Sequence, residues 1–76
     1  MEIEPKLILQ KIKDKIRERR LTNGYTQDYL AYCLKINQST YHKIECGKLK
    51  LKAEHLVIIS VILDFDLNEF KINLNK

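Results

Sequence analysis

Residues that interrupt helices are nearly absent from this chain, and their positions divide it into helical segments. Pro5 is the only proline, and Gly24 and Gly47 are the only glycines. Glycine adopts the left-handed conformation of a helix end without steric cost, so both glycines are predicted helix ends. No segment alternates between apolar and polar residues for more than a few positions. We therefore predict an all-α fold.

The first predicted helix spans residues 6–21. Apolar residues recur there every three to four positions among charged ones, at Ile8 or Leu9, then at Ile12 and Ile16. This spacing is typical of a surface helix with one buried stripe.

Two short helices are predicted next, joined by a brief turn. Thr26 is the expected N-cap of the first, which ends near Lys35. Asn37 is the expected N-cap of the second, which runs from Gln38 to Glu45 and ends before Gly47. The predicted inward residues are Leu30, Ala31 and Leu34 on the first of these helices, and Tyr41 and Ile44 on the second, with Ile36 at its entry.

A fourth helix is predicted at about residues 53–63, and it is apolar on two sides. A helix with two apolar sides should be buried on both. One side is expected to pack on the first three helices, and the other needs a cover. That cover is either a second copy of the chain or the C-terminal tail folding back through Phe70, Ile72 and Leu74. The inner stripe is Leu56, Ile59 and Leu63, and the outer stripe is Val57, Ile58, Val61 and Phe65.

A short fifth helical turn is predicted after the fourth helix. Asp66 and Glu69 have the spacing of a capping box for it. The last letters, FKINLNK, are compatible with a strand or a frayed tail. We predict a single five-helix domain over the whole chain, with its core at about residues 6–70 and a tail at 71–76.

Positive charge is concentrated in the middle of the chain. The formal net charge is +4. Residues 35–52 contain five lysines and one acid, Glu45, whereas residues 53–70 contain four acids and no base. This asymmetry favours a polyanionic partner that contacts one face, although a solvated lysine face gives the same pattern. The five lysines are Lys35, Lys43, Lys48, Lys50 and Lys52.

The composition argues against membrane insertion and against a disulfide framework. The longest apolar run, LVIISVIL, is interrupted by Ser60 and is far shorter than the roughly 20 residues that a membrane span needs. The N-terminus does not resemble a signal peptide, and two cysteines allow at most one disulfide. We expect a cytoplasmic protein with reduced thiols and no membrane partner.

The two short central helices have the form of a helix-turn-helix. In that motif the second helix enters the DNA major groove with its first turn foremost, so hydrogen-bonding side chains belong there. Gln38, Ser39 and Thr40 meet this requirement. The stretch TQDYLAYCLKINQSTYHKIECGKLK resembles the XRE family of Cro and lambda-type repressors. The resemblance rests on Thr26-Gln27, Leu30-Ala31, Ile36, Ser39-Thr40, Ile44-Glu45 and Gly47-Lys48, and it continues through Leu56, Ile59 and Leu63 to DLNEF.

The resemblance implies a lambda-repressor-like, non-enzymatic transcriptional regulator that binds double-stranded DNA. A repressor or controller protein acting as a homodimer on a palindromic operator is the expected form. Gln38, Ser39, Thr40 and Lys43 would read bases, and Gln27, Asn37, His42, Lys48 and Lys50 would bind phosphates. Arg20 and Glu45 would form a structural salt bridge, and Val57, Ile58, Val61 and Phe65 would form the dimer interface.

Three positions depart from the family pattern. Lys35 replaces the usual glycine of the turn, and a left-handed conformation there would cost roughly 1 kcal/mol. Tyr41 replaces an aliphatic residue, so its ring should fill the same pocket while its hydroxyl reaches solvent or a phosphate. Leu51-Lys52 replaces the usual proline and serine or threonine cap before the fourth helix.

The sequence raises three alternatives to DNA binding. Cys33, His42, Cys46 and His55 could ligate zinc, but no close cysteine pair exists and the resemblance accounts for the segment without metal. Cysteine-histidine catalysis is less favoured still, because so small a domain offers little room for a substrate cleft. We predict no cofactor, no metal and no small-molecule effector. A protein-interaction module, such as an antitoxin that binds through the outer stripe of the fourth helix, remains the alternative.

Overall fold

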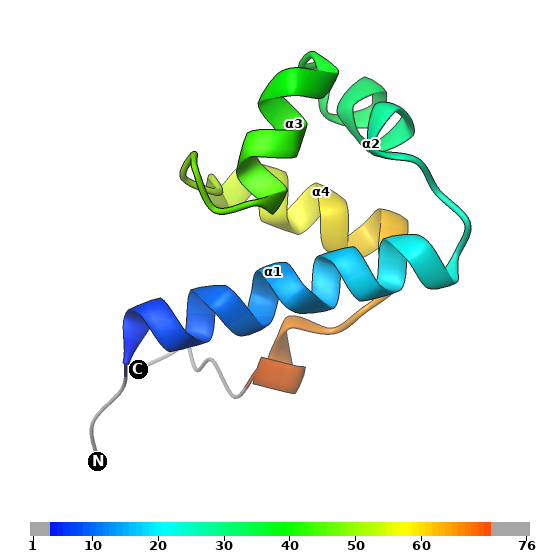
Figure 1. The fold of residues 1–76 in the computed structure, drawn as a ribbon. Coiled ribbons are helices and arrows are strands. Elements are labelled where there is room, and N and C mark those ends of the chain that lie inside the picture. The colour runs from blue at the N-terminus through cyan, green and yellow to red at the C-terminus, as the bar shows by residue number, and fades with distance from the viewer. Residues whose placement is uncertain (1–3, 71–76) are drawn as a thin grey trace.

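The computed structural model describes residues 4–70, and Figure 1 shows that this part of the chain is built from helices. No strand occurs between residues 4 and 70, so the predicted all-α class is confirmed there. The fifth helical segment is a single 3-10 turn, and the predicted count of five α-helices is not confirmed. The α-helices are α1 (Pro5–Thr22), α2 (Gln27–Leu34), α3 (Gln38–Glu45) and α4 (Ala53–Leu63), and the 3-10 turn is η1 (Leu67–Phe70).

α1 packs through one stripe, as predicted. Ile12 and Ile16 are each 2% exposed, and Ile8, not Leu9, continues the stripe toward the N-terminus. Pro5 occupies the first turn, where the missing N–H has no intrahelical partner to lose. Gly24 follows the helix with a φ of 75°, in agreement with its predicted role as a helix end.

The caps of α2 and α3 are the predicted ones. The hydroxyl of Thr26 accepts a hydrogen bond from the Tyr29 N–H at 3.0 Å, and Oδ1 of Asn37 accepts one from the Thr40 N–H at 2.7 Å. Between the helices, Lys35 has a φ of 61° and a ψ of 39°, which is the predicted left-handed conformation. Because each cap satisfies a free amide of the first turn, the two short helices keep fixed ends.

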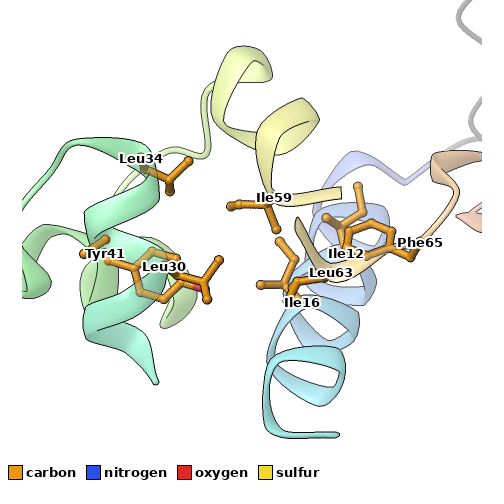
Figure 2. Packing of buried hydrophobic residues seen from close by; sticks show 9 residues of the cluster. Ile12, Ile16, Leu30, Leu34, Tyr41, Ile59, Leu63 and Phe65 are labelled. Carbon is orange, nitrogen blue, oxygen red and sulfur yellow. The ribbon is translucent and has the colours of Figure 1, made fainter. Parts of the chain in front are cut away.

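The core lies where α4 meets the other helices. Figure 2 shows Ile59 of α4 between the side chains of α2 and α3 and those of α1. Ile59, Leu30 and Tyr41 are completely buried. α4 therefore fixes the position of the α2–α3 pair relative to α1.

The end of α4 differs from the predicted outer stripe. Asp64 adopts a left-handed conformation with a φ of 55°, and the Phe65 N–H donates back to the Ser60 carbonyl at 3.0 Å. Helical periodicity therefore stops at Leu63, and Phe65 turns into the core with 9% exposure. The prediction that Phe65 belongs to the exposed stripe is wrong. Arg19 of α1 donates to the carbonyl oxygens of Leu63 and Asp64 at 3.1 and 2.9 Å, which ties this turn to α1.

Some C-terminal predictions lie outside the described residues. Oδ1 of Asp66 accepts a hydrogen bond from the Asn68 N–H at 2.9 Å, but the predicted capping box also needs the Glu69 side chain, which is not described. The predicted cover of the outer stripe by Phe70, Ile72 and Leu74 likewise involves side chains outside the described part.

Candidate nucleic-acid interface

The first turn of α3 presents polar side chains to solvent. Gln38 and Ser39 are exposed, Lys43 is exposed one turn later, and Thr40 is half-buried. Tyr41 and Ile44 lie on the opposite side of α3 and anchor it in the protein. The helix therefore has a fixed inner side and a free outer side, which a groove-reading helix requires. Of the four predicted base-reading residues, Thr40 is the least accessible.

A buried carboxylate at the end of α3 fastens it to α1. Arg20 of α1 donates to both carboxylate oxygens of Glu45, at 2.9 and 3.0 Å, and to the Tyr25 carbonyl at 3.0 Å. The side chains of Arg20 and Glu45 are only 9% and 4% exposed. The predicted structural salt bridge is thus present, and it is bidentate, which fixes the angle between the two helices as well as their distance.

Two further donors complete this carboxylate. The Tyr41 hydroxyl donates to Oε2 of Glu45 at 2.7 Å, and Nε2 of Gln27 donates to Oε1 at 3.2 Å. The prediction that the Tyr41 hydroxyl reaches solvent or a phosphate is wrong, because the residue is completely buried and needs a partner inside the protein. The prediction that its ring fills the core pocket is confirmed.

The surroundings of Glu45 keep it ionised. Burial raises the pKa of Glu45, but hydrogen bonds from Arg20, Tyr41 and Gln27 outweigh that effect and hold its pKa below the ordinary value. Burial is the main cause that raises the pKa of Tyr41, and the hydrogen bond to Glu45 raises it further. The Tyr41 hydroxyl therefore stays protonated and acts as a donor. The negative charge of Glu45 is therefore balanced inside the protein and does not offset the lysines around α3.

Two of the predicted phosphate-binding side chains are linked to the same network. Oε1 of Gln27 lies 3.2 Å from Nδ1 of exposed His42, so the Gln27 amide bridges His42 and Glu45. The oxygen of Asn37 is used by the α3 cap, which leaves its amide nitrogen for a ligand. The Asn37 cap is local and was predicted from the sequence. The bridge through Gln27 was not, because it depends on how α2 and α3 pack.

The basic residues after α3 are exposed and, within residues 4–70, make no ion pair. Lys48 and Lys50 lie in the loop from α3 to α4, and the Lys48 N–H donates to the Lys43 carbonyl at 2.7 Å. Lys13 of α1 is a further base that sequence reasoning did not include. Its Nζ lies 3.4 Å from the place where a Cβ on Gly47 would be, and it lines an open depression together with Lys48 and Lys50. Lys13 lies far from this loop in the sequence, and only tertiary packing brings it close to Lys48 and Lys50.

Comparison with protein-family models finds a match to the helix-turn-helix family over residues 16–70. The chain belongs to this family. Its members are XRE-type, Cro and lambda-repressor-like, and they are DNA-binding transcription regulators that are typically not enzymes. Comparisons with curated proteins and with solved structures found no match.

The helix-turn-helix domain also carries an exposed apolar face on α4. Val57, Ile58 and Val61 are 54%, 40% and 75% exposed. These are the three residues of the predicted outer stripe that remain after Phe65 is removed from it.

The described part of the domain also bears on two alternatives, metal binding and membrane insertion. Between residues 4 and 70, no three His, Cys, Asp or Glu side chains are grouped as metal ligands would be. His42 and Cys46 do approach each other, with Nε2 and Sγ 3.3 Å apart. None of the helices in this range is both long and apolar enough to cross a membrane.

Proposed function

We propose that this helix-turn-helix domain binds double-stranded DNA sequence-specifically, as a homodimer on a palindromic operator, and thereby represses or controls a promoter. The observation that carries this proposal is the exposed first turn of α3. Gln38 and Ser39 are exposed there, whereas Tyr41 and Ile44 on the opposite side of the helix are buried. A helix with this distribution fits the major groove with its polar side against base edges.

Each exposed group has a chemically suitable target. The Gln38 amide can pair with N6 and N7 of an adenine, and Lys43 suits guanine acceptors or a phosphate. Lys48 and Lys50 supply affinity through phosphates without reading sequence. Lys13 extends this basic surface onto α1, since it lines the same depression as those two lysines.

The homodimer part of the proposal is supported by the apolar face of α4. Val57, Ile58 and Val61 are branched aliphatic residues that a two-fold partner would remove from water. Two copies related by such an axis would present their α3 helices to successive major grooves, about 34 Å apart. Light scattering at tens of micromolar should give a dimer mass, and Val61→Glu should reduce it to a monomer mass. A monomer mass for the unchanged protein would count against this arrangement.

Selection of binding sites from random DNA tests the function directly, and a palindromic consensus is expected. On the selected site, Gln38→Ala should cost roughly 1–3 kcal/mol and relax preference at one position, whereas Lys50→Ala should weaken all sequences alike. Lys11→Ala is the control for Lys50→Ala, because it also removes one positive charge. Lys11 lies about 200° around α1 from Lys13 and therefore away from the basic depression. If Gln38→Ala and Lys50→Ala both left affinity unchanged, the docking of α3 would be refuted.

A protein-interaction module is the second candidate, and the exposed α4 face favours it. Salt dependence separates the two functions. DNA affinity should fall steeply with ionic strength because phosphate contacts release counterions, whereas an apolar interface on α4 should change little.

A further inference from the structure

His42 is an exposed residue on the side of α3 that is proposed to meet DNA. It follows Gln38 by four residues and Ser39 by three, so the three side chains share one face of the helix. Its ring is also held from inside the protein, because Nδ1 lies 3.2 Å from Oε1 of Gln27 on α2. When one imidazole nitrogen is held in this way, the chemistry of its partner decides which nitrogen carries the proton.

The hydrogen-bond network places the proton of the neutral ring on Nδ1. Ionised Glu45 only accepts, so the amide nitrogen of Gln27 must point to it and donate, at 3.2 Å. The carbonyl oxygen of Gln27 is then the atom that faces Nδ1 of His42, and it can only accept. Nδ1 therefore donates, and Nε2 of the neutral ring has a lone pair and no hydrogen.

The direction of the Nε2 lone pair, in the plane of the ring, is open to a ligand. Sγ of Cys46 lies 3.3 Å from Nε2 and 3.8 Å from Nδ1, so the sulfur is against the face of the ring and not in line with this lone pair. No other side chain in the described range 4–70 is hydrogen-bonded to Nε2. A ligand can therefore reach this nitrogen from solvent.

We propose that His42 binds a DNA phosphate only in its protonated form, and that Gln27 is the positioning residue that imposes this requirement. In the neutral ring, the Nε2 lone pair would face phosphate oxygens, which also only accept. Protonation adds an N–H at Nε2 and a positive charge, while Nδ1–H keeps its bond to Gln27. DNA affinity therefore rises as the pH falls through the range in which histidine titrates. The inference rests on the DNA binding proposed above.

The charged groups around the ring keep a constant charge over this range. Lysine, arginine and aspartate do not titrate between about pH 6 and pH 7.5, and the pKa of Glu45 is held below its ordinary value. The thiol of Cys46 touches the ring and is itself titratable, so its contribution needs a control variant. The charged groups are Lys43 and Glu45 of α3, Asp28 of α2, and Arg20 of α1, which pairs with Glu45.

The tautomer of His42 tests the geometry without DNA. Free neutral histidine prefers the proton on Nε2, so nitrogen NMR of the protein at about pH 8 should instead show His42 protonated on Nδ1. Gln27→Ala should return the proton to Nε2. His55→Gln removes the other histidine, which lies on α4, and thereby identifies the His42 signals. A proton on Nε2 in the unchanged protein would overturn the role of Gln27.

DNA affinity tests the consequence. On the selected operator at fixed ionic strength, lowering the pH from about 7.5 to about 6 should tighten binding roughly fivefold per bound chain, because each His42 takes up one proton. His42→Gln keeps a hydrogen-bond donor that does not titrate, so its affinity should hardly change with pH. His55→Gln and Cys46→Ser should keep the full response. An equal response in His42→Gln would overturn the proposal.

The response of Gln27→Ala tests the positioning role in the same assay. The neutral ring of this variant can carry its proton on Nε2 and donate to the phosphate, so affinity should depend less on pH than in the unchanged protein. An equal pH dependence in both proteins would refute the positioning role. Failure of the unchanged protein to bind any DNA between pH 6 and pH 7.5 would instead refute the proposed function, while NMR would still decide the tautomer.

Discussion

Replacing Arg20 by methionine should show how much of the domain's stability depends on the α1–α3 ion pair. Methionine keeps most of the apolar stem of arginine but removes the three donors that reach Glu45 and the Tyr25 carbonyl. The Glu45 side chain, which is 4% exposed in the unchanged protein, would lose its cation.

The expected loss is about 3 kcal/mol. Removing one partner of a buried ion pair typically costs about 3–5 kcal/mol, because the other charge stays buried. The lower end applies here, since Tyr41 and Gln27 still donate to the carboxylate. A native domain has roughly 5–15 kcal/mol in total, so the variant should still fold near neutral pH with a much lower urea midpoint.

Urea unfolding followed by circular dichroism measures this loss, and a double-mutant cycle isolates the pair. Glu45→Gln combined with Arg20→Met leaves no buried charge, so the double variant should lose about 2 kcal/mol less than the sum of the single losses. If Arg20→Met cost under about 1 kcal/mol, or if the two losses simply added, the ion pair would not be what joins α1 to α3.

In the same variant, the contribution of Glu45 to stability should change with pH in the opposite direction. The folded protein holds the pKa of Glu45 below its ordinary value, so this group's stabilisation is complete above the unfolded pKa of about 4.3 and is lost as pH falls through the folded pKa. Without Arg20, burial is opposed only by Tyr41 and Gln27, and the pKa should rise. The gap in unfolding free energy between the two proteins should therefore narrow from pH 7 to pH 4. A constant gap would contradict this account of Glu45.

Five further substitutions test the fold in the same urea assay. Lys35→Gly should stabilise by less than about 1 kcal/mol, because relief of the left-handed backbone outweighs the added freedom of the unfolded chain, and Lys35→Ala should give no gain. Ile59→Ala should cost roughly 3–4 kcal/mol through a core cavity, whereas Val61→Ala in dilute monomer should stay within about 0.5 kcal/mol. Asn37→Ala should cost about 1 kcal/mol through loss of the α3 cap.

Local features were predictable from the sequence because they depend on neighbouring residues. The caps at Thr26 and Asn37 follow from side chains within four positions. The left-handed Lys35 was predicted from the family resemblance, because a glycine usually fills that turn position. The Arg20–Glu45 pair was foreseen from the family resemblance, since nothing local joins residues 25 positions apart. The base-reading and dimer assignments stay predictions until DNA and a second copy are tested.

What the sequence by itself determined is an all-α chain with a helix-turn-helix, because helix periodicity and capping act over three to four residues. What only the tertiary structure decided is where side chains go when a helix ends or two helices meet. Phe65 left the outer stripe because the backbone reverses at Asp64, and the Tyr41 hydroxyl turned inward because a buried carboxylate was there to accept it. A buried polar group must find a partner, and the packing of distant helices determines which partner is within reach.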